Sequence, residues 1–164
     1  MEKRLDKNVT IITGGGKGIG FGIAKAFAKE GSNLVITGRT ESRLIAAKER
    51  LEEEYGIEVL AIVADGADEA AINNVVDQTI KKFGKITTLV NNAQVSKSGL
   101  PLVDHTREDI DLALHSGLYA AFFYMRDCYP YLKESKGSVI NFASGAGLFG
   151  KLGQSSYAAA KEGI

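Results

Sequence analysis

The chain has 164 residues with 20 acidic and 20 basic side chains, so its formal net charge at neutral pH is zero. This balance argues against a protein that holds nucleic acid through bulk charge. The length suits a single domain over residues 1–164, and the shares of hydrophobic (45%) and charged (24%) residues are those of an ordinary globular protein. One cysteine, Cys128, excludes an internal disulfide and suits a reducing compartment, so we expect a cytoplasmic protein.

Neither a targeting segment, a membrane span nor a metal site is expected. The first residues are mostly charged and lack the apolar region of a signal peptide. No run approaches the roughly 18 apolar residues of a membrane span. The two histidines, His105 and His115, lie far from other soft metal ligands.

Short apolar runs alternate with segments of helical periodicity along the chain. Five runs predict buried strands, at residues 9–12, 34–36, 59–63, 89–90 and 138–142. Apolar residues three or four apart predict the helices, near residues 19–27, 44–55, 72–83 and 107–132, with a last one from about Ser155. Apolar strands that alternate with helices predict an α/β fold with a doubly wound parallel sheet of the Rossmann type.

Several helix boundaries are marked by specific residues. Gly56 and Gly84 follow the second and third predicted helices and suit their C-terminal ends. Thr106 and Asp109 form a candidate capping box at the start of the long helix. A glycine-rich loop is expected after the fifth strand.

The loop directly after the first strand, residues 13–20, is rich in glycine. It fits the spacing G-x-x-x-G-x-G, and it matches neither G-x-G-x-x-G nor a P-loop. Glycines let the backbone turn sharply and approach a pyrophosphate, while the N–H groups at the helix start face the anion. A merely flexible turn is the alternative, but the position between strand and helix favours nucleotide binding. The residues expected to bind the nucleotide here are Gly14, Gly16, Lys17, Gly18, Ile19 and Gly20.

The residues after the second strand bear on the choice of nucleotide. An acidic side chain there would bind the ribose 2′-hydroxyl of NAD, but this position holds Arg39. A guanidinium can bind a 2′-phosphate through its planar fork, and Lys17 would add a second positive charge. The pattern therefore predicts a preference for NADP(H), with NAD(H) possible. Two ordinary surface cations are the alternative.

Tyr157 and Lys161 stand four residues apart in the last predicted helix, so they share one helix face. The ammonium there favours the phenolate form, so the tyrosine can give or take a proton near physiological pH. Taken alone, such a pair is more often a solvated surface pair. Ser144 lies thirteen residues before Tyr157, just after the fifth strand.

Taken together, these segments resemble the short-chain dehydrogenase/reductase family, from Thr13 to the last residue. The motifs that carry the resemblance are the glycine loop, Asp65 after the third strand, Asn91-Asn92-Ala93 after the fourth, Ser144, and Tyr157-x-x-x-Lys161. The resemblance implies that Asp65 bonds the adenine edge. It also implies that Asn91 helps to hold the sheet, and that Asn92 and Ala93 lie beside the cofactor.

The resemblance further implies an oxidoreductase that acts on a small-molecule carbonyl or alcohol. Tyr157 would protonate the substrate oxygen as the hydride arrives, and Ser144 would hold and polarise the carbonyl. Lys161 would favour the phenolate and bond the nicotinamide ribose. Family members associate through the long helix and the Tyr157 helix, so we expect a homo-oligomer, a tetramer for a full-length chain.

One departure from the family pattern lies in the long helix. The family usually has a catalytic Asn thirteen residues before a proline, and counting back from Pro130 reaches Gly117. In the family that Asn carbonyl helps a water bridge to the lysine, which Gly117 is expected not to do. Ser116 and His115 are expected to point elsewhere, and an Asn restored at position 117 is expected to raise activity.

Two further departures concern Gln94 and the length of the chain. Gln94 follows Asn-Asn-Ala where the family has glycine, and its side chain is expected to crowd the adenosine half of the cofactor. The chain is also expected to be C-terminally incomplete, because family members continue with two more strands. The fifth strand would then be an exposed edge. These departures leave open an alternative, a catalytically impaired or dead nucleotide-binding or regulatory module.

Overall fold

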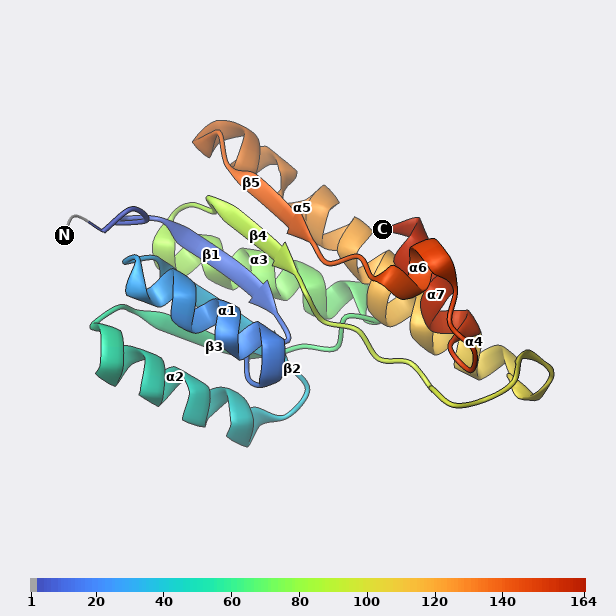
Figure 1. Cartoon of the computed structure of the whole chain (residues 1–164). Coiled ribbons are helices and arrows are strands. Elements are labelled where there is room, and N and C mark those ends of the chain that lie inside the picture. Colours follow the sequence, from blue (N-terminus) through green and yellow to red (C-terminus); the bar gives the residue numbers. More distant parts are fainter. Residues whose placement is uncertain (1–2) are drawn as a thin grey trace.

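The structure, a computed structural model, describes residues 3–164 and contains one parallel sheet with the strand order β3-β2-β1-β4-β5 (Figure 1). The strands are β1 (Val9–Thr13), β2 (Asn33–Gly38), β3 (Val59–Val63), β4 (Thr88–Asn91) and β5 (Ser138–Asn141). All strand pairs are parallel, and Ile12 of β1 pairs with Ile36 on one side and Val90 on the other. The five predicted strands and the Rossmann-type α/β fold are confirmed.

Helices connect the strands and continue to the end of the chain. They are α1 (Gly18–Lys29), α2 (Glu41–Tyr55), α3 (Glu69–Phe83), α4 (Arg107–Ala113), α5 (Ala120–Ser135), α6 (Gly145–Phe149) and α7 (Ser155–Gly163). Two further helical segments are not α-helical. They are the 3₁₀ turn η1 (Leu102–Asp104) and the π-helical turn η2 (Leu114–Tyr119). As predicted, Gly56 and Gly84 end α2 and α3 with left-handed φ angles of 65° and 73°.

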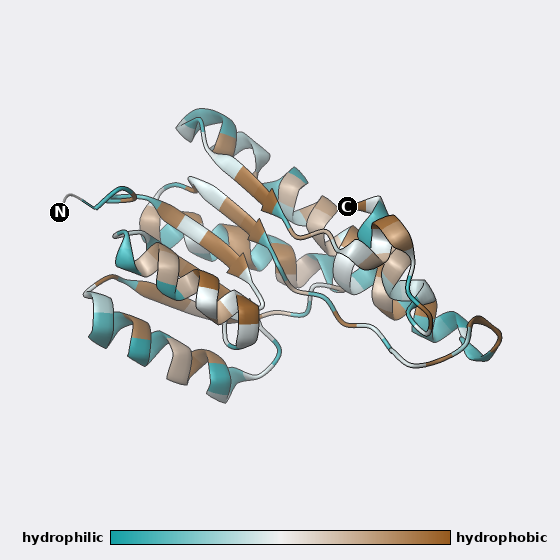
Figure 2. Cartoon of the chain, viewed as in Figure 1, coloured by the Kyte–Doolittle hydropathy of each residue, from teal (hydrophilic) through white to brown (hydrophobic). Residues whose placement is uncertain are grey.

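Two helical layers cover the two faces of the sheet (Figure 1). α1 and α2 pack on one face, where Ala24, Leu44 and Leu51 meet buried strand residues. α3 and α5 pack on the other face, where Ile72 and Tyr124 are among the buried residues. The strands between the layers are mostly hydrophobic (Figure 2). This burial on both sides explains why the strand sequences are apolar throughout rather than alternating.

The first helix contacts the sheet through smaller residues than its periodicity suggests. The apolar stripe of the sequence begins at Ile19, yet this side chain is 71% exposed. The fully buried positions are instead Gly20, Ala24 and Ala28, because small residues let the helix axis come close to the strands. Ile19 is thereby left free at the start of α1.

The long helix predicted over residues 107–132 is interrupted. Its start is as predicted, because Thr106 Oγ1 accepts from Asp109 N at 3.2 Å and Asp109 Oδ2 accepts from Thr106 N at 3.1 Å. The π-helical turn η2 then separates α4 from α5, and α5 continues to Ser135. The Ser116 hydroxyl donates to the Leu112 carbonyl at 2.6 Å, which competes with the regular backbone ladder.

The glycine-rich segment after β5 contains the short helix α6, where a loop was expected. β5 itself is an edge strand, as expected, and Val139 and Ile140 on it are 40% and 39% exposed. Over residues 3–164, no helix combines the length and hydrophobicity needed to cross a bilayer. The same residues contain no group of three His, Cys, Asp or Glu side chains placed to hold a metal ion.

Candidate active site

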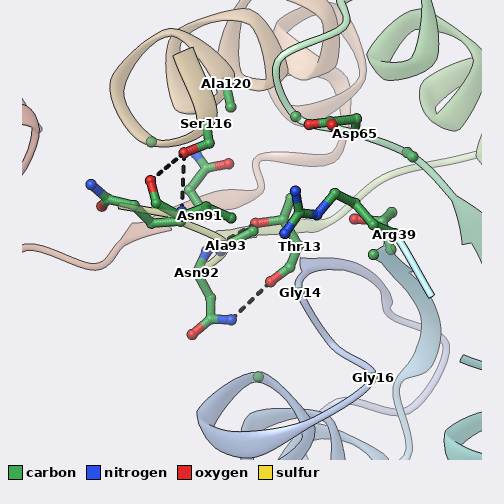
Figure 3. A pocket seen from close by; sticks show the side chains of 18 of the residues that line it. Thr13, Gly14, Gly16, Arg39, Asp65, Asn91, Asn92, Ala93, Ser116 and Ala120 are labelled. Atoms are coloured by element: carbon green, nitrogen blue, oxygen red, sulfur yellow. Dashed lines mark hydrogen bonds between the residues drawn. The ribbon is translucent and has the colours of Figure 1, made fainter. Parts of the chain in front are cut away.

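A cavity of about 540 Å³ opens at the carboxyl ends of the strands. The strand order reverses between β1 and β4, which is where parallel α/β sheets bind ligands. Most of the predicted cofactor residues line it: Gly14, Gly16, Lys17, Gly18, Ile19, Gly20, Arg39, Asp65, Asn92, Ala93 and Lys161. In Figure 3, Asp65 and Arg39 lie on one side of the cavity, and Asn92 and Ser116 lie on the other.

The glycine loop passes close to backbone and side chains that leave no room for a Cβ atom. Gly14 has φ of +69°, and a Cβ there would lie 3.1 Å from Asn92 Nδ2. A Cβ on Gly20 would overlap the Gly14 carbonyl oxygen. Glycine is therefore required at both positions, which keeps the loop compact and leaves the N–H groups at the start of α1 open to the cavity.

The hydroxyl of Thr13 joins the ends of β1 and β4 beneath this loop. Thr13 Oγ1 accepts from the backbone N–H groups of Asn92 at 3.0 Å and of Ala93 at 2.9 Å. The Asn92 amide returns a bond, donating to the Thr13 carbonyl at 2.9 Å (Figure 3). These bonds fix the two central strand ends relative to one another, and therefore fix the floor of the cavity.

Three basic side chains surround the part of the cavity next to the glycine loop. Lys17 and Arg39 were predicted there, and Arg43 on the first turn of α2 joins them in the cavity lining. Within residues 3–164, none of the three forms an ion pair with a carboxylate. Arg43 was not predicted from the sequence, although it lies only four residues after Arg39 and in the first turn of α2. The three charges are free to bind an anion.

The acidic and amide residues after β3 and β4 have distinct contacts. Asp65 is exposed, and its Oδ1 accepts from Ala67 N at 3.0 Å. This bond shapes the turn after β3 and leaves Oδ2 available to a ligand. Asn91 Nδ2 donates to Asn141 Oδ1 at 2.9 Å, which ties β4 to β5. Asn91 thus occupies the sheet-holding position that the resemblance implied.

The three candidate catalytic residues come from the segment after β5. Ser144 caps α6, with its Oγ accepting from Ala146 N at 3.2 Å. Lys161 is 6% exposed and its Nζ donates to the Phe142 carbonyl. The same Nζ lies 5.9 Å from the ring centroid of Tyr157, which is half-buried. Of the three, only Lys161 is in the cavity lining; Ser144 directly precedes α6, and Tyr157 lies on α7 together with Lys161.

Burial changes the pKa of Lys161. Removal of the Lys161 ammonium from water lowers its pKa, because an apolar environment disfavours the charged form. Its bond to the Phe142 carbonyl holds the nitrogen at the start of the β5–α6 connection. α6 and α7 pack closely there, and a Cβ on Gly147 would lie 2.9 Å from Glu162 N. This close packing sets the position of Ser144 relative to the Tyr157 helix.

One expectation about the departing residues is wrong. Ser116 does not point away: it lines the cavity, and its Oγ, whose hydrogen goes to the Leu112 carbonyl, accepts from Val95 N at 3.0 Å (Figure 3). The Gln94 amide enters the space that the missing side chain at Gly117 leaves, and crowding of the adenosine half stays a prediction. His115 is exposed and points elsewhere, as expected, with its ring tilted against that of Tyr119.

Comparison with known proteins identifies the family of this chain. The chain belongs to the short-chain dehydrogenase family, whose family model matches residues 8–164. It is 59% identical over 166 residues to 12alpha-hydroxysteroid dehydrogenase of Clostridium sp., a match that covers 98% of this chain and 64% of that protein.

Solved structures of similar fold include one bound to NAD+ and one complexed with NADPH. NAD+-bound xylitol dehydrogenase superimposes with a TM-score of 0.93 at 28% identity, covering 99% of this chain and 62% of that one. L-sorbose reductase from Gluconobacter frateurii, complexed with NADPH and L-sorbose, gives 0.93 at 29% identity with the same coverage. The chain therefore spans less than two thirds of the length of these relatives.

Proposed function

We propose that this protein is an oxidoreductase that transfers a hydride between NADP(H) and a carbonyl or alcohol substrate. The observation that carries the proposal is the group of unpaired cations, Lys17, Arg39 and Arg43, beside the glycine loop. No acidic side chain stands at the end of β2 to bind a ribose 2′-hydroxyl. NAD(H) is the less favoured cofactor.

The cavity suits a dinucleotide in shape as well as in charge. Gly14 and Gly20 form a cradle that a Cβ would fill, and the N–H groups at the start of α1 suit a pyrophosphate. Asp65 has a free carboxylate oxygen for the adenine edge. One or two charge-assisted bonds to a 2′-phosphate contribute about 1.5–3 kcal/mol each, which corresponds to at least tenfold discrimination.

The proposed chemistry uses the residues after β5. The bound nicotinamide supplies or accepts the hydride. Tyr157 gives a proton to the substrate oxygen during reduction and takes it back during oxidation. Lys161 stabilises the phenolate form of Tyr157, and Ser144 hydrogen-bonds the substrate oxygen. The presence of all three favours an enzyme over a nucleotide-binding module without catalysis.

A steroid alcohol is the first substrate to test. The relative that is 59% identical is named for a 12α-hydroxysteroid, and the likeness covers 98% of this chain. We propose a hydroxysteroid or its ketone as the substrate class, with other small carbonyl compounds as comparison substrates.

We also propose a homo-oligomer that forms through the helices α4 and α5. The segment 119–124 contains four aromatic residues, of which Phe123 and Tyr124 pack within the protein's own core. Tyr119 and Phe122 are 43% and 58% exposed and remain available to a second copy. Light scattering at micromolar concentration is expected to give a multiple of the 17.5 kDa chain mass, and a monomer would refute this proposal.

The test of the cofactor proposal is a titration of the protein with NADPH and with NADH. We expect NADPH to bind at least tenfold more tightly. Arg39→Ser should reduce this ratio, and Arg43→Ser should reduce it further. Lys29→Ser is the matched control, because Lys29 is a cation in the last turn of α1, at the far end from the glycine loop. Equal or tighter binding of NADH by the unmodified protein would overturn the proposal.

A further inference from the structure

Gln94 carries a buried amide that the fold itself leaves without a partner. Neither Oε1 nor Nε2 of Gln94 has a hydrogen-bond partner among residues 3–164, and both atoms are shielded from solvent. A buried amide without hydrogen-bond partners destabilises a fold. It is retained where a group outside the chain supplies those partners. The side chain nevertheless lies at the wall of the cavity rather than in the core.

The amide occupies the space that Gly117 leaves open. A Cβ on Gly117 would lie 2.7 Å from Gln94 Cδ, 2.9 Å from Nε2 and 3.0 Å from Oε1. The Gln94 side chain and a side chain at position 117 therefore compete for one place. The two departures from the family pattern, 23 positions apart in the sequence, are a single structural unit.

The backbone on both sides of this contact is held in place. Ser116, next to Gly117, accepts a hydrogen bond from the backbone N–H of Val95, next to Gln94. The π-helical turn η2 bends the helix at this point, and such turns are frequent at functional sites. The amide is thus carried on a clamped segment, as a binding group requires.

Lys161 provides a second polar group on the same cavity. Its Nζ uses one donor on the Phe142 carbonyl, and an ammonium has three. An amide offers both a donor and an acceptor, so it suits a hydroxyl group, which can accept and donate at once, and Lys161 adds spare donors to the cavity lining.

We propose that Gln94 is a ligand-binding residue whose amide, seated over Gly117, exchanges hydrogen bonds with a hydroxyl group bound in the cavity. The inference rests on the proposed function, which supplies hydroxyl groups from two sources. One source is the sugars of the dinucleotide, and the other is the alcohol substrate.

The first test replaces the amide by a side chain of similar length without polar atoms, Gln94→Met. We expect the melting temperature to stay unchanged or rise, because the unpartnered amide is gone. Binding should weaken at least fivefold. A weaker NADPH affinity in a fluorescence titration identifies the sugar hydroxyl. A raised KM for a 12α-hydroxysteroid at unchanged NADPH affinity identifies the substrate hydroxyl. Gln78→Met on α3 is the control and should change neither quantity.

The second test measures the coupling between positions 94 and 117. Gly117→Ala should lower the melting temperature of the unmodified protein, since the new Cβ displaces the amide. In the Gln94→Ala background the space is vacant, and the same substitution should raise the melting temperature because alanine favours a helix. This replaces the expectation that an Asn at position 117 improves the protein by itself.

The outcomes separate the inference from the proposed function. If the unmodified protein binds neither NADPH nor NADH, the proposed function fails and the inference fails with it. If the unmodified protein binds NADPH, but Gln94→Met leaves NADPH affinity and the steroid KM unchanged, only the inference is overturned. A lower melting temperature of Gln94→Met, or the same sign for Gly117→Ala in both backgrounds, also overturns it.

Discussion

Replacing Thr13 by valine should weaken the fold at the floor of the cavity. Thr13 is 5% exposed, and its hydroxyl is the acceptor for the N–H groups of Asn92 and Ala93. Valine keeps the shape of the side chain but removes this acceptor. Each N–H left without a partner costs about 1–3 kcal/mol, so the loss of both bonds should lower the free energy of unfolding by about 2–6 kcal/mol.

Thr13→Ser is the matched control for this substitution. Serine retains the hydroxyl and loses one methyl group, which contributes about 0.8 kcal/mol when buried. The free energy of unfolding of all three proteins follows from urea titrations monitored by circular dichroism. The hydrogen-bond account predicts a much larger loss for valine than for serine. Equal losses, or a larger loss for serine, would show that packing rather than the hydroxyl holds the two strand ends together.

Three further predictions concern the loop, the buried lysine and the cysteine. Gly20→Ala should abolish dinucleotide binding in an NADPH titration, because its Cβ would overlap the Gly14 carbonyl oxygen. Retained affinity would contradict the role of Gly20 in the dinucleotide-binding loop. Burial lowers the pKa of Lys161 and so disfavours the folded state while the ammonium is charged. The unfolding free energy relative to Lys161→Met should therefore rise with pH, from the lowered pKa up to the usual value near ~10.4, in urea titrations; a flat or falling difference would contradict this. Burial raises the pKa of Cys128 to about 12, so this thiol should react with a disulfide reagent at pH 8 only in the unfolded protein.

The sheet was predictable because its strands are buried on both faces. Continuous apolar runs such as residues 59–63 can be recognised without knowledge of their neighbours, and β3 has these same bounds. The glycine loop could be placed for a similar reason, since its position between a strand and a helix follows from the local sequence. Helix ends at Gly56 and Gly84 were equally local features.

The break in the long helix was not predictable from periodicity. Apolar spacing near 3.6 residues cannot distinguish a regular helix from one with a single π-helical turn. The adjacent Ser116 and Gly117 are a signal in retrospect, because a serine can bond the carbonyl four residues back and glycine weakens the helix. Neither residue shows from the sequence alone that Val95 is the other partner.

The candidate site was predictable where its residues follow strand ends and hidden where they meet through space. Asp65 and Asn92 were identified through the family resemblance, whose motifs follow β3 and β4. Arg43 was missed because it lies one turn inside a helix, where charged residues are common. The pairing of Gln94 with Gly117 depends on how the segment after β4 lies against η2, which only the tertiary structure supplies.

The step proposed for Tyr157 is the transfer of a proton to the substrate oxygen in an NADP(H)-dependent reaction. The most direct measurement follows NADPH absorbance with a 12-oxosteroid for the unmodified protein and for Tyr157→Phe, alongside an NADPH binding titration of each. Phenylalanine keeps the ring but removes the proton, so turnover should fall by about 10²–10⁴-fold while NADPH affinity stays the same. Turnover that survives Tyr157→Phe undiminished would contradict the account.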